Sequence, residues 1–393
     1  MADTENNKNS NSPASTSAPA LRVPGFTEPW QKCRLGDYIR IFSGESPNRI
    51  NSEYDKIPYY KVEQLNWCEK YLGETPYLSQ RGKNILPEGC VVFSKRGAAI
   101  LTNKVRMNLF PINIDTNLMG IKADNSFILD QYLFYFILRA RLNRIADTST
   151  IPQINNIHIN PITIYVPSLA EQEIITKFLA LLDERIATQR RLIEDLEKLM
   201  SSIVDRIFSD VDGEVVKFRD ILEISTQRND GKADYRILSA SQEFGMIERD
   251  SLDIDIKAEA KSVKMYKRVH PGDYVLHLRS FQGGLAFAEV EGICSPAYTI
   301  LRPNKRLEYG YLKEYFNSSK FIKSLVLVTY GIRDGRSINV EEFLDMNISI
   351  HHKNKQAEIV KSLSMLSDKL NVEASILNRY EQQRAYLLSN LFI

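Results

Sequence analysis

The 393-residue sequence has little cysteine and no long apolar run, and both shortages narrow what the chain can be. Its four cysteines are scattered and form no C-x-x-C pair, so neither a disulfide framework nor a zinc site is expected. No apolar stretch has the length of a membrane span, and the polar N-terminus lacks the basic start and apolar core of a secretion signal. We therefore expect a cytoplasmic protein with reduced thiols.

An excess of one charge is also missing. The 51 Lys and Arg residues against 49 Asp and Glu residues give a formal net charge of +2. A nucleic-acid-binding protein with a large basic face is usually more unbalanced. If DNA is the ligand, the fold must gather the basic side chains on particular surfaces. The length allows two or three separate cores.

Catalytic motifs are absent from the sequence as well. It contains no G-x-G-x-x-G, no P-loop, no G-x-S-x-G and no H-E-x-x-H. The five histidines have no metal-ligand spacing, and residues 160–163 (NPIT) lack the second proline and the aromatic residue of the N-P-P-Y/F motif of base-methylating enzymes. We expect no catalytic residue, no metal site and no cofactor in this chain.

The most prominent pattern present is one long amphipathic helix. No proline or glycine occurs from Ser168 to about Phe208, and ten positions from Ile175 to Ile207 recur at alternating steps of four and three, nine of them apolar. Ser168 followed three residues later by Glu171 predicts a capping box. At 1.5 Å per residue the helix is roughly 60 Å long. Its apolar stripe requires a partner.

An internal repeat identifies that partner. KFRDILEIS (217–225) resembles RLGDYIRIF (34–42), PGDYVLH (271–277) resembles PEGCVVF (87–93), and QAEIVKSLSMLSDKL (356–370) resembles QEIITKFLALLDERI (172–186). The matches share an offset of 183 to 184 residues. A second long helix is therefore expected near the C-terminus, with Asn354 as its cap. Pseudo-twofold packing of a duplicated unit makes the two helices antiparallel.

The polar seam positions of the two helices correspond to each other. Gln189 is the one polar seam residue of the first helix, and Glu373 occupies the equivalent position of the second. Antiparallel packing places both near the midpoints, so the pair can fix the coiled-coil register. The alternative is that both side chains lie at the edge of the seam and reach solvent.

The segments outside the long helices combine short strands with polar loops. Strands are expected at 59–65, 89–95 and 162–166, and a helix at 130–142. Arginine, lysine, glutamine, asparagine and serine in loops are the side chains that contact base edges and phosphates in DNA. The loop residues that we select as DNA-binding candidates are Gln80, Arg81, Lys83, Lys95, Arg96, Asn155, Arg228, Arg236, Arg279, Ser280, Gln282, Arg333 and Arg336. Among these, Arg279 and Arg333 are expected to influence sequence choice more than Lys305 or Lys320.

The ordered chain resembles the specificity subunits of type I restriction-modification systems. The resemblance is carried by RVPGFTEPWQKCRLGDY near the start, by PSLAEQEIITKFLALLDERI at the junction with the first long helix, and by SINVEEFLDMNISI before the second. It implies an α+β fold with two similar α/β target recognition domains joined by two long antiparallel coiled-coil helices. The expected segments are a disordered tail (1–24), domain 1 (25–167), helix 1 (168–209), domain 2 (210–351) and helix 2 (352–393).

The same resemblance implies a function and partners. Each domain would recognise one half of a bipartite site in double-stranded DNA, and the helices would set the unread spacer and dock two methyltransferase subunits. S-adenosylmethionine and ATP would be bound by the methyltransferase and restriction subunits rather than by this chain. Two alternatives stay open: a fused restriction-methylation enzyme or nuclease with an unrecognised site, and a coiled-coil scaffold that binds no DNA.

Overall fold

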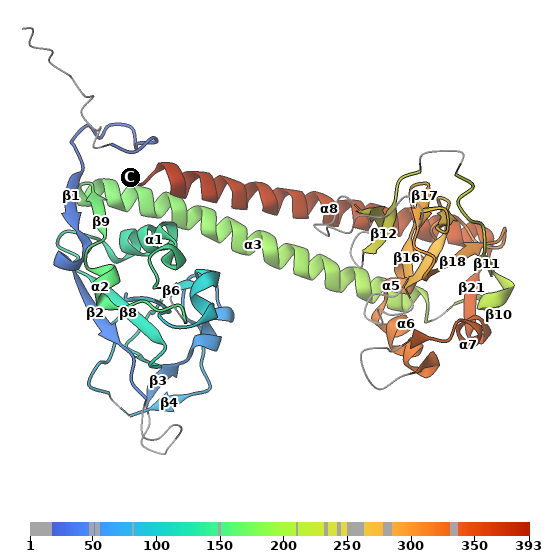
Figure 1. The fold of residues 1–393 in the computed structure, drawn as a ribbon, viewed down its shortest axis with the longest axis horizontal. Coiled ribbons are helices and arrows are strands. Elements are labelled where there is room, and N and C mark those ends of the chain that lie inside the picture. The colour runs from blue at the N-terminus through green and yellow to red at the C-terminus, as the bar shows by residue number, and fades with distance from the viewer. Residues whose placement is uncertain are drawn as a thin grey trace, which may run out of the picture. The chain divides into compact units, whose positions relative to one another are not determined.

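A computed structural model describes residues 18–46, 51, 56–80, 82–147, 151–209, 211–231, 235–241, 245–249, 263–277, 285–330 and 337–393. The chain divides into two compact units. The first consists of Met1–Arg190 with Ile376–Ile393, and the second of Arg191–Ser375. Each unit contains its own sheets and its own hydrophobic core (Figure 1).

The central sheet of the first unit is antiparallel, with the strand order β2-β8-β5-β6. The strands are β2 (Ile39–Ser43), β5 (Val91–Ser94), β6 (Val105–Met107) and β8 (Leu118–Ala123). All four residues of β5 are buried, which explains why this strand has no alternation of polar and apolar residues. Helix α1 (Asp130–Ala140) packs in the same core and buries every side chain from Tyr132 to Ile137.

Smaller elements complete the first unit. They are β1 (Gln31–Arg34), β3 (Ile57–Tyr60), β4 (Leu78–Ser79), β7 (Asn113–Ile114), β9 (Thr163–Val166), α2 (Asn156–Ile159) and 3-10 turns at Leu35–Asp37, Val62–Asn66, Ala98–Thr102 and Leu142–Arg144. The strands expected at 89–95 and 162–166 and the helix expected at 130–142 are confirmed. The strand expected at 59–65 is wrong beyond Tyr60, because Gln64 accepts a 2.6 Å hydrogen bond from the Lys61 N–H and starts a 3-10 turn.

The central sheet of the second unit has the equivalent strand order, β11-β18-β15-β16, and is also antiparallel. Its strands are β11 (Leu222–Ser225), β15 (Tyr274–His277), β16 (Leu285–Phe287) and β18 (Tyr298–Pro303). The other strands are β10 (Gly213–Lys217), β12 (Leu238–Ser241), β13 (Gly245–Glu248), β14 (Lys267–Val269), β17 (Gly292–Cys294), β19 (Thr329–Tyr330), β20 (Ser337–Ile338) and β21 (Asn347–His351). The helices are α5 (Lys313–Asn317), α6 (Ser319–Ser324) and α7 (Val340–Asp345), with 3-10 turns at Phe218–Asp220 and Leu325–Val328.

Two long helices, α3 (Leu169–Ile207) and α8 (Lys353–Asn390), contribute to both units. In the first unit, the start of α3 packs against the end of α8, and Leu179 and Leu182 share a core with Leu387. In the second unit, the end of α3 packs against the start of α8, and Val204 shares a core with Ile359. The two helices therefore run antiparallel within each unit.

A buried glutamine near the start of each long helix makes the same set of hydrogen bonds. In the first unit, the Gln172 Oε1 accepts from the Leu129 N–H at 2.8 Å, and its Nε2 donates to the carbonyls of Phe127 and Pro167. In the second unit, the Gln356 Oε1 accepts from the Glu308 N–H at 2.8 Å. Its Nε2 donates to the carbonyls of residues 306 and 351. Each amide joins its helix to a loop of its own domain.

The two helix starts differ from the expected caps. The Ser168 hydroxyl accepts from the Glu171 N–H at 3.3 Å, which is one half of a capping box. The Glu171 carboxylate instead accepts from the Arg22 Nε at 3.1 Å and the Trp30 indole N–H at 3.3 Å. The expected cap at Asn354 is wrong, because α8 already begins at Lys353.

The segment before residue 25 is partly packed, which corrects the expected tail of 1–24. Leu21 donates its N–H to the Asn390 carbonyl at 2.9 Å, and the side chains of Leu21 and Val23 contact the core. Arg22 forms an ion pair with Glu171, whose side chain is only 1% exposed. The N-terminal segment therefore covers the start of α3, while residues 1–17 lie outside the described part of the chain.

The four cysteines are free thiols, and Cys90 and Cys294 are buried. Burial raises the pKa of each of these two thiols to about 12. Across the described ranges, no group of three or more His, Cys, Asp or Glu side chains is arranged to hold a metal ion. None of the helices in the described ranges has both the length and the apolar character needed to cross a bilayer.

Candidate DNA interface

The Lys95–Arg96 pair lies in a loop whose backbone is bonded to two other segments, at residue 117 and at residues 153–154. The loop follows β5, and its Lys95 N–H donates to the Asn117 carbonyl at 2.8 Å. The Lys95 carbonyl accepts from the Ile154 N–H at 2.9 Å, and Arg96 forms a β-bridge with Gln153. Burial, with the neighbouring Arg96 charge, lowers the pKa of Lys95, whereas Asp115 opposes this shift.

The β-bridge between Arg96 and Gln153 brings Asn155 close to the Lys95–Arg96 loop. Asn155 precedes α2, and its N–H donates to the His158 Nδ1 at 3.0 Å. Its side-chain oxygen accepts from the Gln153 Nε2 at 3.1 Å. Lys95, Arg96 and Asn155 are thus collected from two segments that are far apart in the sequence.

Gln80 and Lys83 follow β4, and a hydrogen bond from Asn113 of strand β7 connects this segment to the Lys95 loop. The Gln80 carbonyl accepts from the Asn113 side chain at 2.7 Å, and the Lys83 N–H donates to the Glu45 carboxylate at 3.2 Å. Asn113 begins β7, which leads to the Asn117 carbonyl that holds Lys95. The side chains of both Gln80 and Lys83 are exposed. We call Gln80, Lys83, Lys95, Arg96 and Asn155 the first loop surface.

Arg228 and Arg236 lie beside neighbouring strands of the second unit. Arg228 forms a β-bridge with Lys267 of β14, and the Arg236 carbonyl accepts from the Ile293 N–H of β17 at 2.9 Å. Strands β14 and β17 pair with each other, so both arginines belong to one small strand cluster. The Arg236 guanidinium forms an ion pair with Glu248.

The same cluster contains three basic residues that the sequence analysis missed: Arg249, Lys267 and Arg268. The Arg268 guanidinium lies 4.3 Å from the centre of the Tyr235 ring, and its Nη2 is 2.5 Å from the Glu291 carboxylate. The Arg249 Nη1 donates to the Tyr266 hydroxyl at 3.3 Å. The adjacent Lys267-Arg268 pair repeats the Lys95-Arg96 pattern and was the signal that could have identified it.

Several candidates lie outside the described residues. They are Arg81, Arg279, Ser280, Gln282, Arg333 and Arg336. The roles expected for Arg279 and Arg333 therefore stay predictions.

The proposed register pair also stays a prediction. Gln189 is half-buried on the α3 segment of the first unit. Glu373 is 5% exposed on the α8 segment of the second unit, where Lys369 forms an ion pair with it one helical turn earlier. A buried carboxylate with a lysine partner is consistent with a structural role at this position.

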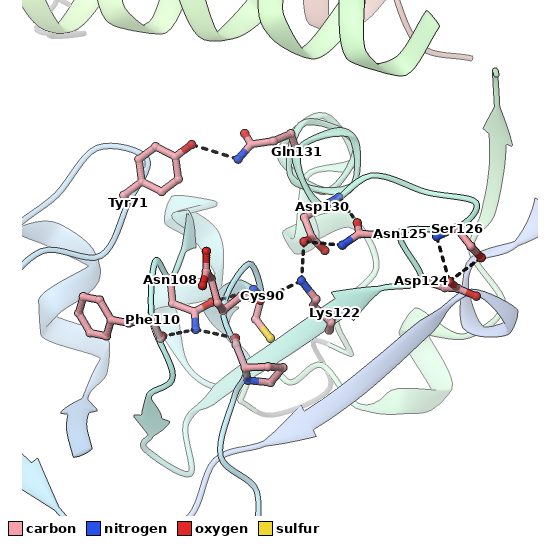
Figure 2. A network of polar contacts seen from close by, with 12 residues as sticks. Tyr71, Cys90, Asn108, Phe110, Lys122, Asp124, Asn125, Ser126, Asp130 and Gln131 are labelled. Atoms are coloured by element: carbon pink, nitrogen blue, oxygen red, sulfur yellow. Dashed lines mark hydrogen bonds and ion pairs between the residues drawn. The ribbon is translucent and has the colours of Figure 1, made fainter. Parts of the chain in front are cut away.

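A separate polar network in the first unit connects α1, the central sheet and nearby loops (Figure 2). The Asn108 side chain accepts from the Cys90 N–H at 2.7 Å and donates to two carbonyls of nearby loop residues. Lys122 forms an ion pair with Asp130 at the start of α1. Gly89 lies beside this ion pair with φ of +80°, a left-handed backbone conformation that favours glycine. The network therefore joins α1 to the central sheet.

Comparison with known proteins finds a domain match in the first half of the chain. Residues 27–198 match the model of the type I restriction modification DNA specificity domain. The putative type I restriction enzyme MjaX specificity subunit of Methanocaldococcus jannaschii is 23% identical over 188 residues, covering 46% of this chain and 43% of that protein. The MjaVIII specificity subunit of the same organism is 25% identical over 232 residues, covering 52% and 51%. The chain thus spans about half the length of the curated relatives that it matches.

Solved structures share the fold across nearly the whole chain. The crystal structure of a type I restriction-modification S subunit from M. genitalium covers 96% of this chain and 99% of its own, with a TM-score of 0.57 and 15% identity. A structure from a study of type I complex assembly and conformational transition covers 95% and 99%, with a TM-score of 0.58 and 17% identity. Residues 27–198 therefore resemble the type I restriction modification DNA specificity domain, and nearly the whole chain shares its mixed α/β fold with solved S subunits.

Proposed function

We propose that this chain is the DNA-recognition subunit of a type I restriction-modification complex and has no catalytic role of its own. The observation that carries the proposal is the specificity domain matched over residues 27–198. A central sheet with the same strand order in the second unit supports a second recognition domain. Each domain would recognise one half of a bipartite site in double-stranded DNA.

In this proposal the side chains of the loops contact the DNA bases and phosphates, and the sheets hold these loops in position. The first loop surface presents two exposed basic side chains, Lys83 and Arg96, together with the amides of Gln80 and Asn155. Arginine and lysine pair with guanine or phosphate, and the amides pair with adenine. In the second unit, Arg228 and Arg236 with Lys267 would act in the same way. The net charge of +2 is sufficient if partner subunits supply further phosphate contacts.

The long helices would set the spacer and dock the catalytic subunits. An exposed apolar stripe on the first-unit part of α3 supports docking: Ile174, Phe178 and Leu181 are 46%, 48% and 54% exposed. They recur at i, i+4 and i+7, so they lie on one face of the helix. S-adenosylmethionine and ATP would be bound by the methyltransferase and restriction partners, and the DNA methylation itself would occur there.

Mapping of methylated bases tests this function. The complex reconstituted from this chain and two methyltransferase subunits should methylate one bipartite sequence, and omission of this chain should abolish the selectivity. Methylation by the isolated chain would instead support a fused enzyme. A complex that assembles but shows no sequence-selective, salt-dependent DNA binding would support a scaffold.

A further inference from the structure

A basic pocket lies in the first unit, where the last turn of α1 and strand β6 meet residues 183–190 of α3 and the last turns of α8. Its volume is about 380 Å³, within the range of small-molecule sites. Six basic side chains line it: Lys70, Arg106, Arg139, Arg141, Arg190 and Arg384. Three acidic side chains also line it, so the lining carries an excess of three positive charges.

The three carboxylates of this basic pocket all form ion pairs with two arginines, which leaves one negative charge among these five groups. The Asp183 carboxylate accepts a hydrogen bond from the Tyr135 hydroxyl at 2.8 Å and lies 2.5 Å from the Arg384 Nε. Arg190 forms ion pairs with both Glu69 and Glu381. The other four cations form no ion pair with a carboxylate of the described residues.

Three of these four cations donate hydrogen bonds that the structure describes. The Lys70 ammonium donates to the Tyr135 hydroxyl at 3.0 Å and lies 4.5 Å from the centre of the same ring. The Arg106 Nε donates to the Leu65 carbonyl at 3.1 Å, and the Arg139 Nη1 donates to a main-chain oxygen of Ile393 at 2.9 Å. A carbonyl, a hydroxyl or a ring accepts a hydrogen bond without cancelling the charge of the donor, so Lys70 and Arg106 keep their positive charges in the pocket.

The backbone at the mouth of the pocket is held in an uncommon conformation. Arg141, the C-cap of α1, has φ of +53°, and Asn103 opposite it has φ of +48°. The Asn103 side chain donates to the Leu138 carbonyl at 2.9 Å and accepts from the Leu142 N–H at 3.0 Å. Asparagine tolerates a left-handed conformation, but at an arginine this conformation is costly, and such strained residues are concentrated at functional sites.

We propose that this pocket binds a phosphate group. Guanidinium groups form paired, charge-assisted hydrogen bonds with phosphate oxygens, and Arg106 and Arg141 lack a competing carboxylate. The phosphate can come from the DNA backbone or from a free nucleotide. The DNA source rests on the proposed DNA-recognition function, whereas the nucleotide source does not.

Burial supports the need for an anion in this pocket. It lowers the pKa of Lys70 to about 8, even though Asp183 opposes the shift, and it also lowers the pKa of Arg139. Both lowered pKa values mean that the carboxylates of the pocket stabilise these cations by less than the loss of hydration destabilises them.

The free-phosphate source is tested on the full chain with pyrophosphate as the probe. Isothermal titration at pH 7 should show binding by the wild type that Arg106→Gln or Arg141→Asn weakens at least tenfold. Asparagine tolerates the left-handed backbone at position 141, so this variant keeps the fold. Arg144→Gln is the matched control, because Arg144 is exposed nearby and does not line the pocket.

The DNA source is tested on the complex with methyltransferase subunits. In Arg106→Gln, the slope of log Kobs against log salt should fall by about 0.9 for each lost phosphate contact, without a change in the preferred sequence. If the wild-type complex shows no sequence selectivity, the proposed function is wrong. The titration with pyrophosphate then remains the test of phosphate binding in the pocket. The inference is overturned if wild type and variants agree in both measurements, or if the variants lose only subunit assembly, which would indicate a carboxylate of a partner protein.

Discussion

At the scale of single residues, Lys70 makes the stability of the first unit depend on pH. Its pKa is about 8 in the folded chain, against 10.5 for a free lysine side chain. Between these values the unfolded chain binds a proton that the folded chain does not, so folding becomes more favourable as the pH rises from 8 to 10.5. Tyr135 of α1, Asp183 of α3 and Arg384 of α8 face the ammonium, and the raised pKa of Tyr135 keeps that hydroxyl neutral in this range.

We therefore predict that Lys70→Met removes this rise in stability between pH 8 and pH 10. Thermal unfolding followed by circular dichroism at several pH values measures the effect. Lys32→Met is a suitable control, because Lys32 is exposed in the same unit. An unchanged pH profile in Lys70→Met would show that the ammonium is better hydrated than its surroundings indicate.

The two buried glutamines allow a second test at this scale. Gln172→Leu would leave the Leu129 N–H and the carbonyls of Phe127 and Pro167 without their partner. Since an unsatisfied buried polar group costs about 1–3 kcal/mol, the loss of unfolding free energy should be about 3 kcal/mol. Gln356→Leu should cost a similar amount. Denaturant unfolding measures both, with the exposed Gln382→Leu as the control.

At the scale of elements, the apolar stripe of α3 predicts an effect on assembly rather than on folding. Ile174 and Phe178 are about half exposed, so the double change to aspartate should leave the helix content unchanged. It should abolish co-purification with the methyltransferase subunit, because two charges would enter an apolar contact. Size-exclusion chromatography measures this. The double change Arg191→Asp, Asp195→Arg on an exposed part of α3 should assemble normally.

The register pair of α3 and α8 requires a different measurement. If Gln189 and Glu373 interact across the coiled coil, their leucine substitutions should be coupled by more than 0.5 kcal/mol in a double-mutant cycle. Additive effects would favour the alternative, in which both side chains lie at the edge of the seam. Chemical unfolding of the two single variants and the double variant distinguishes these outcomes.

The long helices could be predicted because their signal is local. The apolar seam from Ile175 to Ile207 and the absence of proline and glycine are visible within one window of sequence, and α3 spans Leu169–Ile207. The role of Gln172 could not be predicted, because its partners Phe127 and Leu129 are distant in sequence. The same reason explains why the packing of Arg22 on Glu171 was missed.

The candidate DNA interface was only partly predictable. A loop composition of arginine, lysine and amides identified Lys95, Arg96 and Asn155, and β-bridging collects them. The Lys267–Arg268 pair was missed because it lies on strand β14, not in a loop. The basic pocket was missed because its cations come from α1, β6, α3, α8 and a loop, and only the folded chain brings them together.

At the scale of the whole molecule, the strand pairs at the domain boundaries predict modular exchange. Residues 214–350 begin in β10 and end in β21, and these two strands pair with each other. An exchanged segment therefore carries both members of the pair and needs no new partner. Replacing 214–350 by the corresponding segment of another family member should change one half of the methylated sequence and leave the other half intact. Sequencing of methylated host DNA measures the outcome, and a change in both halves would contradict independent domains.

The two equivalent glutamines, Gln172 and Gln356, affect how genes of this kind can recombine. The amide of residue 172 and that of residue 356 hold their domains through carbonyl and N–H groups of the backbone, and such groups are present whatever side chains the loops carry. Mutations that alter every loop side chain therefore leave the attachment intact. A gene with this arrangement can acquire a new domain by recombination within the flanking segments, and the descendant protein would fold at the first generation without compensating changes in its helices.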